Sequence, residues 1–217
     1  MKREEYINYP ALSASGIKRH YTGDLKHIRK ALDAGASLHQ RLLEVQVEHY
    51  DSEAANVYRA INDNPIAAII FNNARYEVPA VTELVINSTI IPAKAMYDII
   101  NKEAGVIADV KTTKAKTLKA FQSDMIRHYN HIQAVWYCMV ANIEPDKFYY
   151  IGVTERSRTD SGSGLDIFIH RHSQQEIEQA YELINGFILS NKDKIVDIRT
   201  RYELNRKKNL SNNSPLY

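Results

Sequence analysis

The spacing of apolar residues divides the chain into helical and strand-like regions. Leucine and valine recur at helical spacing over 38–47, and Asn64-Pro65 is typical of an N-cap followed by proline at the first helical position. Over 76–113, dense β-branched residues separated by turn residues favour strands. The predicted elements are a short helix through 17–20 capped by Ser13 or Ser15, helices over 34–48 and from 65, strands within 76–113, one long helix over 117–141, strands over 148–154 and 165–170, and a helix over 173–191.

This order of elements predicts an α/β fold, in which a central mixed β-sheet is flanked by helices and preceded by an N-terminal helical region. We expect one domain over residues 1–200, with a helical part at 1–73 and an αβ core at 74–200. Residues 201–217 read as a polar, basic tail, and we expect it to fray or be disordered over 205–214.

Composition narrows the class of protein. The 217 residues are 44% hydrophobic and 25% charged, with a formal net charge of +2, so binding of a polyanion would need local clusters of positive charge. The single cysteine, Cys138, lies in an apolar run and excludes a disulfide scaffold or a four-cysteine metal site. The sequence has neither a membrane-length apolar run nor a signal peptide, and we expect a cytoplasmic protein.

The main chemical candidate is the stretch 107–113, which places Asp109 and Lys111 two residues apart in a strand. Alternate side chains of a strand point to opposite faces, so these two share a face while Ala108 and Val110 pack on the other. The turn-like stretch 101–105 would bring Asp98 alongside Asp109 in an antiparallel pair. Two carboxylates and a lysine suit metal-assisted phosphodiester hydrolysis. The plainer interpretation of Asp-x-Lys is a solvated surface pair.

Other candidates have equally plain alternatives. Glu83 could complete a metal shell or be an exposed strand residue, and His39 could ligate a metal or be a partly buried helix residue. Gln133 and Tyr137 share a helix face that could point at the site or pack on the sheet. Histidines such as His170 and His172 show no convincing pattern of metal ligands. A basic run could bind phosphates or be a solvated helix start; it contains Lys114, Lys116, Lys119 and Arg127.

Taken in order, these residues resemble the PD-(D/E)XK nucleases, which have a restriction-endonuclease-like core. The strongest similarity is to the RecE-like (exonuclease VIII) branch, which is related to YqaJ and lambda exonuclease. No single piece is specific, but the ordered set is, and it spans residues 8–190. The set comprises Ala11-Leu-Ser-Ala-Ser-Gly16, Ala34-Gly-Ala-Ser-Leu-His39, Glu83, Asp98, Asp109-Val-Lys111 and Gln133-Ala-Val-Trp-Tyr137.

The resemblance implies a DNA exonuclease that degrades one strand from duplex ends, typically 5′ to 3′, to expose single strands for recombination. By position, Asp98, Asp109 and His39 would hold Mg²⁺ (Mn²⁺ can substitute), and Lys111 would be the catalytic lysine. Glu83 would be an auxiliary carboxylate. Gln133 and Tyr137 would form the helix motif that supports the site.

The proline of the family motif is absent, and Ile107-Ala108 stands before Asp109. The sequence leaves three points open: whether a single-strand annealing protein is a partner, whether the chain forms a homo-oligomeric ring, and whether it comes from a phage. The competing functions are a structure-specific endonuclease, a non-catalytic DNA-end-binding accessory protein and a purely structural domain.

Overall fold

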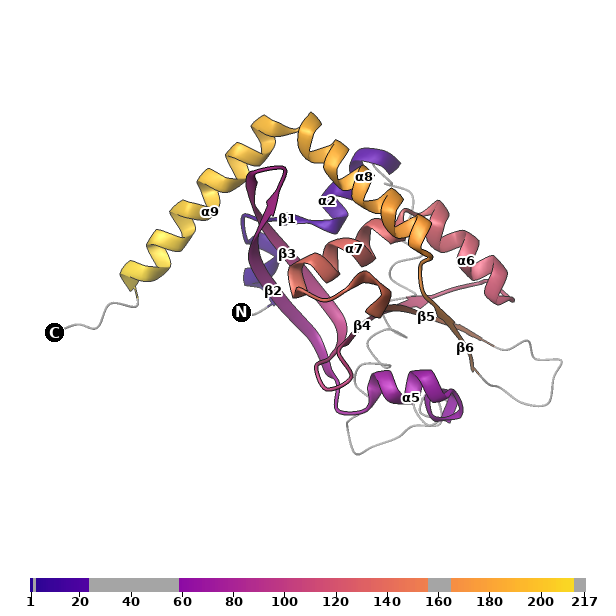
Figure 1. Ribbon diagram of the computed structural model, residues 1–217. Helices are drawn as coiled ribbons and strands as arrows, with labels where there is room; N and C mark the ends of the chain where they lie inside the picture. The colour runs from indigo at the N-terminus through magenta and orange to yellow at the C-terminus, as the bar shows by residue number, and fades with distance from the viewer. Residues whose placement is uncertain (2, 24–58, 156–164, 213–217) are drawn as a thin grey trace.

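The structure of the protein is a computed structural model that describes residues 1, 3–23, 59–155 and 165–212. Within these residues, a mixed β-sheet is flanked by helices, as the sequence predicts (Figure 1). The elements are α1 (Arg3–Asn8), β1 (Leu12–Ser13), α2 (Ala14–Thr22), α5 (Pro65–Phe71), β2 (Arg75–Ile86), β3 (Thr89–Asn101), β4 (Val106–Thr112), α6 (Leu118–Arg127), α7 (Asn130–Ala141), the 3-10 helix η2 (Pro145–Lys147), β5 (Phe148–Glu155), β6 (Leu165–His170), α8 (Gln174–Ser190) and α9 (Lys192–Asn212).

Strand β3 pairs with three other strands, β1, β2 and β4. Strand β2 pairs antiparallel with β3, and the two form a hairpin whose turn residues Asn87 and Ser88 have φ values of 49° and 60°. Both φ values are positive, as a two-residue type I′ turn requires. Further along, β4 pairs antiparallel with β3, β5 parallel with β4, and β6 antiparallel with β5, while the short β1 runs parallel to β3. The catalytic candidates on β3 and β4 therefore lie in the middle of the sheet.

The two faces of the sheet pack against different helices. Ala108 and Val110 of β4 join a small core with Ala67 and Ile70 of α5. Ile107, on the opposite face of the same strand, belongs to the larger core, to which α2, α6, α7 and α8 contribute. The alternation predicted for β4 is thus confirmed, and Asp109 and Lys111 project into the layer between the sheet and α7.

Helix starts follow the sequence signals. Ser13 caps α2 by accepting the N–H of Gly16, and Asn64 caps α5 by accepting the N–H groups of the two residues after Pro65. Ser173 caps α8, and Glu176 completes a capping box by accepting the Ser173 N–H. The predicted starts of these three helices are thus confirmed.

The long helix predicted over 117–141 is wrong, because the chain breaks into α6 and α7 at His128 and Tyr129. Tyr129 has φ 52° and ψ 35°, a left-handed conformation that no helix continues through. The break lets the two helices contact different strands. Phe121 of α6 lies against Gly152 of β5, where an added Cβ would come within 2.7 Å of the ring.

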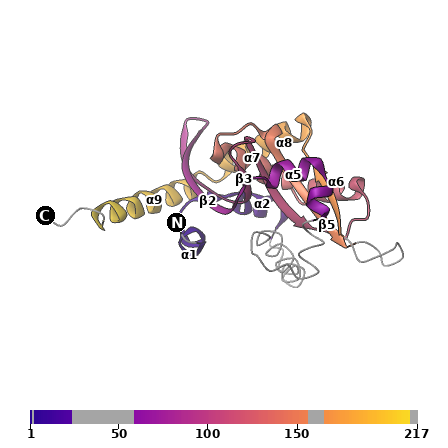
Figure 2. The same cartoon turned by 90° about the horizontal axis from the view of Figure 1, so that it is seen from below.

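The prediction of a disordered tail over 205–214 is also wrong for most of that range, because α9 continues as a helix to Asn212. In both views α9 projects away from the rest of the molecule (Figures 1 and 2). The helix predicted over 34–48 lies outside the described residues. Cys138 is buried, as expected. Of the helices that the structure describes, none combines the length and the apolar character needed to cross a membrane.

Candidate active site

Asp98 and Asp109 meet where β3 and β4 diverge. The antiparallel ladder runs through Ile99 and Ala108, so the next opposed pair is Asp98 and Asp109. Asp98 accepts the backbone N–H of Val110 through Oδ2 at 2.9 Å, so its side chain takes the place of a strand carbonyl there. The two carboxylates are brought together as the sequence predicts.

Asp109 is 2% exposed, and its carboxylate interacts with the charges of Asp98, Lys111 and Lys18. Its Oδ2 lies 2.5 Å from Nζ of Lys111, whose side chain is 30% exposed. Burial first and the Asp98 charge second raise the pKa of Asp109 to about 6, although Lys111 opposes the shift. Burial tends to lower the pKa of Lys111, but the two carboxylates outweigh it, so the net shift is upward and the amine is a cation.

Helix α7 supplies the amide that orients Asp109. Gln133 donates from Nε2 to Oδ1 of Asp109 at 2.6 Å. Tyr137 lies one turn further along α7 and packs its ring edge-to-face with Tyr97 at a centroid distance of 5.5 Å. Burial, followed by the charge of Asp109, raises the pKa of Tyr137 well above its usual value, so the phenol stays neutral. The predicted glutamine–tyrosine face therefore does point at the carboxylates.

Lys18 of α2 is a member of this group that the sequence reasoning missed. Its Nζ donates to Oδ1 of Asn130, the first residue of α7, at 2.6 Å. Burial and then repulsion by Lys111 lower the pKa of Lys18 to about 8, while Asp109 partly offsets the shift. The sequence placed Lys18 correctly on a helix, but only the packing of α2 against α7 brings its amine close to the carboxylates.

The donor set fits a hard divalent cation. Asp109 Oδ2 is buried and, apart from its ion pair with Lys111, has no hydrogen-bond partner among the described residues. The Lys111 cation offsets the cost of burying this oxygen. Asp98 and Asp109 would supply the oxygen ligands that Mg²⁺ prefers.

One predicted site residue, Glu83, is not part of this group. Glu83 pairs in register with Pro92, six residues before Asp98 on β3, which is about 20 Å along the strand. Its carboxylate instead lies 3.3 Å from Arg206 of α9. In the β2–β3 register it is Glu77 that falls opposite Asp98, but Glu77 is exposed and paired with Arg3 at 3.1 Å. His39 lies outside the described residues.

The predicted DNA-binding residues are all exposed. Lys114 and Lys116 lie in the segment just after β4, and Lys119 follows in the first turn of α6. Arg127, at the end of α6, forms an ion pair with Asp124. The three lysines therefore continue the chain directly from the strand that carries Asp109 and Lys111.

The fold has counterparts among solved structures. A candidate exonuclease from Eubacterium rectale matches 93% of this chain and 87% of its own, with 14% identity and a TM-score of 0.57. A phage-related exonuclease from Haemophilus somnus 129PT matches 94% of this chain and 99% of its own, with 12% identity and a TM-score of 0.40. The structure of LHK-Exo in complex with dAMP matches 95% of this chain and 96% of its own, with 13% identity and a TM-score of 0.36.

The first of these likenesses shows a shared fold across nearly the whole chain. No protein-family model and no curated protein sequence matches the chain.

Proposed function

We propose that the protein is a metal-dependent deoxyribonuclease that acts as an exonuclease at duplex DNA ends. The observation that carries this proposal is the convergence of Asp98, Asp109 and Lys111, with Asp109 buried and its Oδ2 paired with the Lys111 amine. A buried carboxylate held at a raised pKa, beside a second carboxylate and a cation, is typical of a site built for a ligand.

Each residue has a separable role. Asp98 and Asp109 would hold Mg²⁺, or Mn²⁺ in its place, and the ion would supply Lewis-acid activation of the scissile phosphate and of the attacking water. Lys111 orients the attacking water or offsets the charge that develops on the phosphate. Gln133 fixes the Asp109 carboxylate through Oδ1, while Oδ2 faces Lys111. Lys18 adds a second positive charge beside the site.

DNA reaches this site past exposed positive charge. Lys114, Lys116 and Lys119 follow the catalytic strand and would contact backbone phosphates. Exonuclease action is supported by the sequence resemblance and by the fold shared with the candidate exonuclease from Eubacterium rectale, and a 5′ to 3′ polarity by the resemblance alone. The exposed single strand would feed recombination or repair, with an annealing protein as a partner.

The test is digestion of end-labelled linear duplex DNA, with closed circular duplex as the second substrate, in Mg²⁺, in Mn²⁺ and in EDTA. We expect metal-dependent loss of label from linear DNA alone, with the labelled end revealing the polarity. Asp109→Asn keeps the shape of the side chain and removes its charge, so it should abolish digestion. Asp193→Asn, the same change at an exposed position of α9, should digest like the parent protein.

Three results would contradict the proposal in different ways. Cleavage of the circular duplex would indicate a structure-specific endonuclease on this fold. Binding of duplex ends without cleavage in any metal would indicate an accessory protein. Neither cleavage nor binding at low salt would indicate a structural domain.

A further inference from the structure

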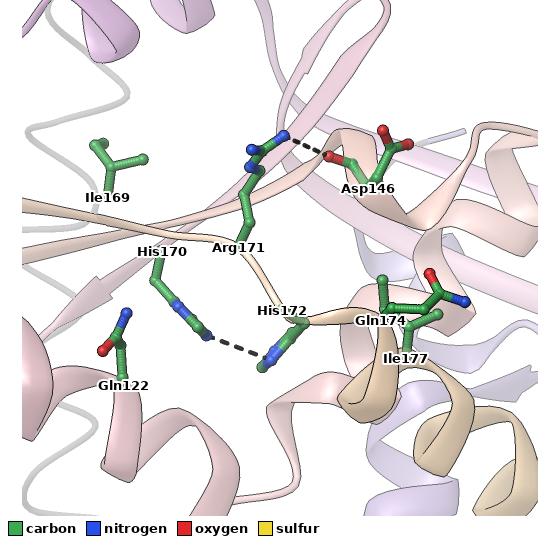
Figure 3. A pocket seen from close by; sticks show the side chains of 8 residues that line it. All are labelled: Gln122, Asp146, Ile169, His170, Arg171, His172, Gln174 and Ile177. Atoms are coloured by element: carbon green, nitrogen blue, oxygen red, sulfur yellow. Dashed lines mark hydrogen bonds between the residues drawn. The ribbon is translucent and has the colours of Figure 1, made fainter.

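A second cluster of possible metal ligands lies where β6 leads into α8. His170 ends β6, His172 follows two residues later, and Glu176 lies in the first turn of α8. In Figure 3 the imidazoles of His170 and His172 point toward one another, whereas Arg171 between them turns away toward Asp146. Side chains at alternate positions thus converge at the strand end, and the helix adds a carboxylate.

The distances suit a small tetrahedral ion. Nε2 of His170 lies 3.3 Å from Nδ1 of His172, and Nδ1 of His172 lies 3.1 Å from Oε2 of Glu176. One ligand atom from each residue falls within 4.8 Å of the other two. Tetrahedral zinc with bonds of about 2.0–2.1 Å to nitrogen or oxygen separates its ligand atoms by about 3.3–3.4 Å. The first two separations, 3.3 Å and 3.1 Å, are close to this distance between ligand atoms.

The imidazoles also lack partners for their other nitrogens. Nδ1 of His170 and Nε2 of His172 are buried without a hydrogen bond within the described part of the chain. His131, from the first turn of α7, is 2% exposed, and neither of its ring nitrogens has a hydrogen bond there. Its ring packs edge-to-face on His172 with centroids 5.9 Å apart. Buried imidazole nitrogens usually find partners, so the packing here is unusual; the ligand atoms of a metal would be the facing nitrogens, His170 Nε2 and His172 Nδ1.

The protonation states are the ones that a metal needs. Burial lowers the pKa of His172 to about 4 and also lowers the pKa of His131 and His170. The carboxyl pKa of Glu176 is shifted downward as well: burial opposes that shift, but the Ser173 backbone N–H and His172 outweigh it. At neutral pH the cluster therefore presents neutral imidazoles and one carboxylate, which are ligating forms.

An ion has a route to the cluster. His170 and His172 line a pocket of about 510 Å³, together with Gln122 of α6 and the start of α8 (Figure 3). Three protein ligands with a water from this pocket would complete four-coordination. Oε2 of Glu176, the oxygen that faces His172, also accepts the Ser173 N–H at 2.7 Å, and a carboxylate oxygen has lone pairs for both this bond and an ion.

We propose that His170, His172 and Glu176 bind one Zn²⁺ ion at a site distinct from the carboxylate pair. Imidazole ligands select Zn²⁺ over Mg²⁺, which prefers all-oxygen coordination. The β4–β5–β6 register aligns Asp109, Tyr150 and His170, so the two sites are about 10 Å apart across the sheet. The buried Tyr150 ring separates them: Lys111 lies over it at 5.8 Å, and the His172 ring is 5.5 Å away. The ion would join the end of β6 to α8.

The test is metal binding by the full chain after removal of metal with EDTA. We expect one equivalent of Co²⁺ to give the intense visible absorption of a tetrahedral site, and Zn²⁺, but not excess Mg²⁺, to displace it. Zn²⁺ should also raise the melting temperature. The same titration on Asp109→Asn separates the two sites, because this variant should retain the equivalent that belongs to the histidines.

Matched variants make the assignment specific. Glu176→Gln keeps a residue suited to the capping box but removes the carboxylate ligand, so it should lose the tetrahedral spectrum while still folding. His172→Asn should lose it too, whereas His20→Asn, a change at an exposed histidine of α2, should not. An unchanged spectrum in Glu176→Gln and His172→Asn, or loss of the equivalent in Asp109→Asn, would overturn the proposal. So would a parent protein that binds no Zn²⁺, because the cluster would then be a packed histidine pair.

Discussion

Replacing Gln133 with leucine tests how the proposed metal site is tuned. The leucine keeps most of the side-chain volume but removes the Nε2 donor that lies 2.6 Å from Oδ1 of Asp109. A hydrogen bond to a charged group contributes about 1.5–3 kcal/mol, and one pKa unit corresponds to about 1.4 kcal/mol. The pKa of Asp109, which is already about 6, should therefore rise by roughly one to two units.

The consequence for catalysis lies in the metal dependence. Losing a partner that orients a metal ligand typically costs about 10- to 100-fold in metal affinity. In Gln133→Leu we expect the half-saturating Mg²⁺ concentration for digestion of linear duplex to rise by about that factor. The rate at saturating Mg²⁺ should fall much less, and raising the pH should recover part of the affinity, because protons compete with the metal for Asp109.

The assay measures initial rates of label release across a Mg²⁺ titration at two pH values. Gln179→Leu, the same change at an exposed position of α8, is the matched control and should titrate like the parent protein. If Gln133→Leu loses rate at every Mg²⁺ concentration with no shift of the midpoint, Gln133 does not act through Asp109. A large fall in melting temperature would instead show that its role is in packing.

Four further results are expected. Lys111→Ala should lower the digestion rate at saturating Mg²⁺ by roughly 10²–10³-fold while circular dichroism and the melting curve stay near those of the parent. Because burial raises the pKa of Asp109 to about 6, digestion should fall as the pH drops through that value, and the midpoint should move lower at higher Mg²⁺. Lys18→Met should move the same midpoint upward, since the Lys18 charge lowers the pKa of Asp109. Gly152→Ala would place a Cβ 2.7 Å from the Phe121 ring and should cost about 1–3 kcal/mol of unfolding free energy, read from urea denaturation.

The arrangement around Asp109 could be predicted because it follows from local rules. Strand periodicity puts Asp109 and Lys111 on one face, and a short turn ending at Gly105 places Asp98 opposite Asp109. Helical periodicity likewise pairs Gln133 with Tyr137. These relations depend only on neighbours along the chain, so the sequence alone is sufficient to predict them.

The errors come from contacts between distant segments. The α6–α7 break at Tyr129 is set by tertiary packing, since its ring stacks on Tyr21 with centroids 5.8 Å apart. Nothing in the local pattern of the helix signals it. Counting residue pairs from the Asn87–Ser88 turn would have excluded Glu83, because the hairpin register pairs it with Pro92 and not with Asp98. The approach of Lys18 depends on how α2 packs on α7, which no local pattern contains.

The histidine cluster did leave a signal in the sequence. His170 and His172 alternate at a strand end, and Glu176 lies in the first turn of the capped helix that follows, where its carboxylate reaches back to His172. This cluster was not predicted from the sequence because the histidines and the glutamate belong to different secondary-structure elements. Only the strand-to-helix geometry shows that their ligand atoms meet.

Unsatisfied polar atoms connect the two proposed sites. Across the part of the chain that the structure describes, the buried side-chain nitrogen and oxygen atoms without a hydrogen bond are Asp109 Oδ2, both ring nitrogens of His131, His170 Nδ1 and His172 Nε2. All of them belong to the two groups of residues on either side of Tyr150, in the layer between the sheet and the helices α7 and α8. The other buried side-chain nitrogen and oxygen atoms of the described residues have partners, as folding requires. Asp109 Oδ2 faces the Lys111 cation, and His172 Nδ1 faces His170 Nε2 and Glu176 Oε2, so a bound ion at either place would add ligand bonds that the protein alone does not supply. We therefore expect Mg²⁺ and Zn²⁺ to raise the melting temperature additively, because separate sites contribute independently to the free energy of unfolding.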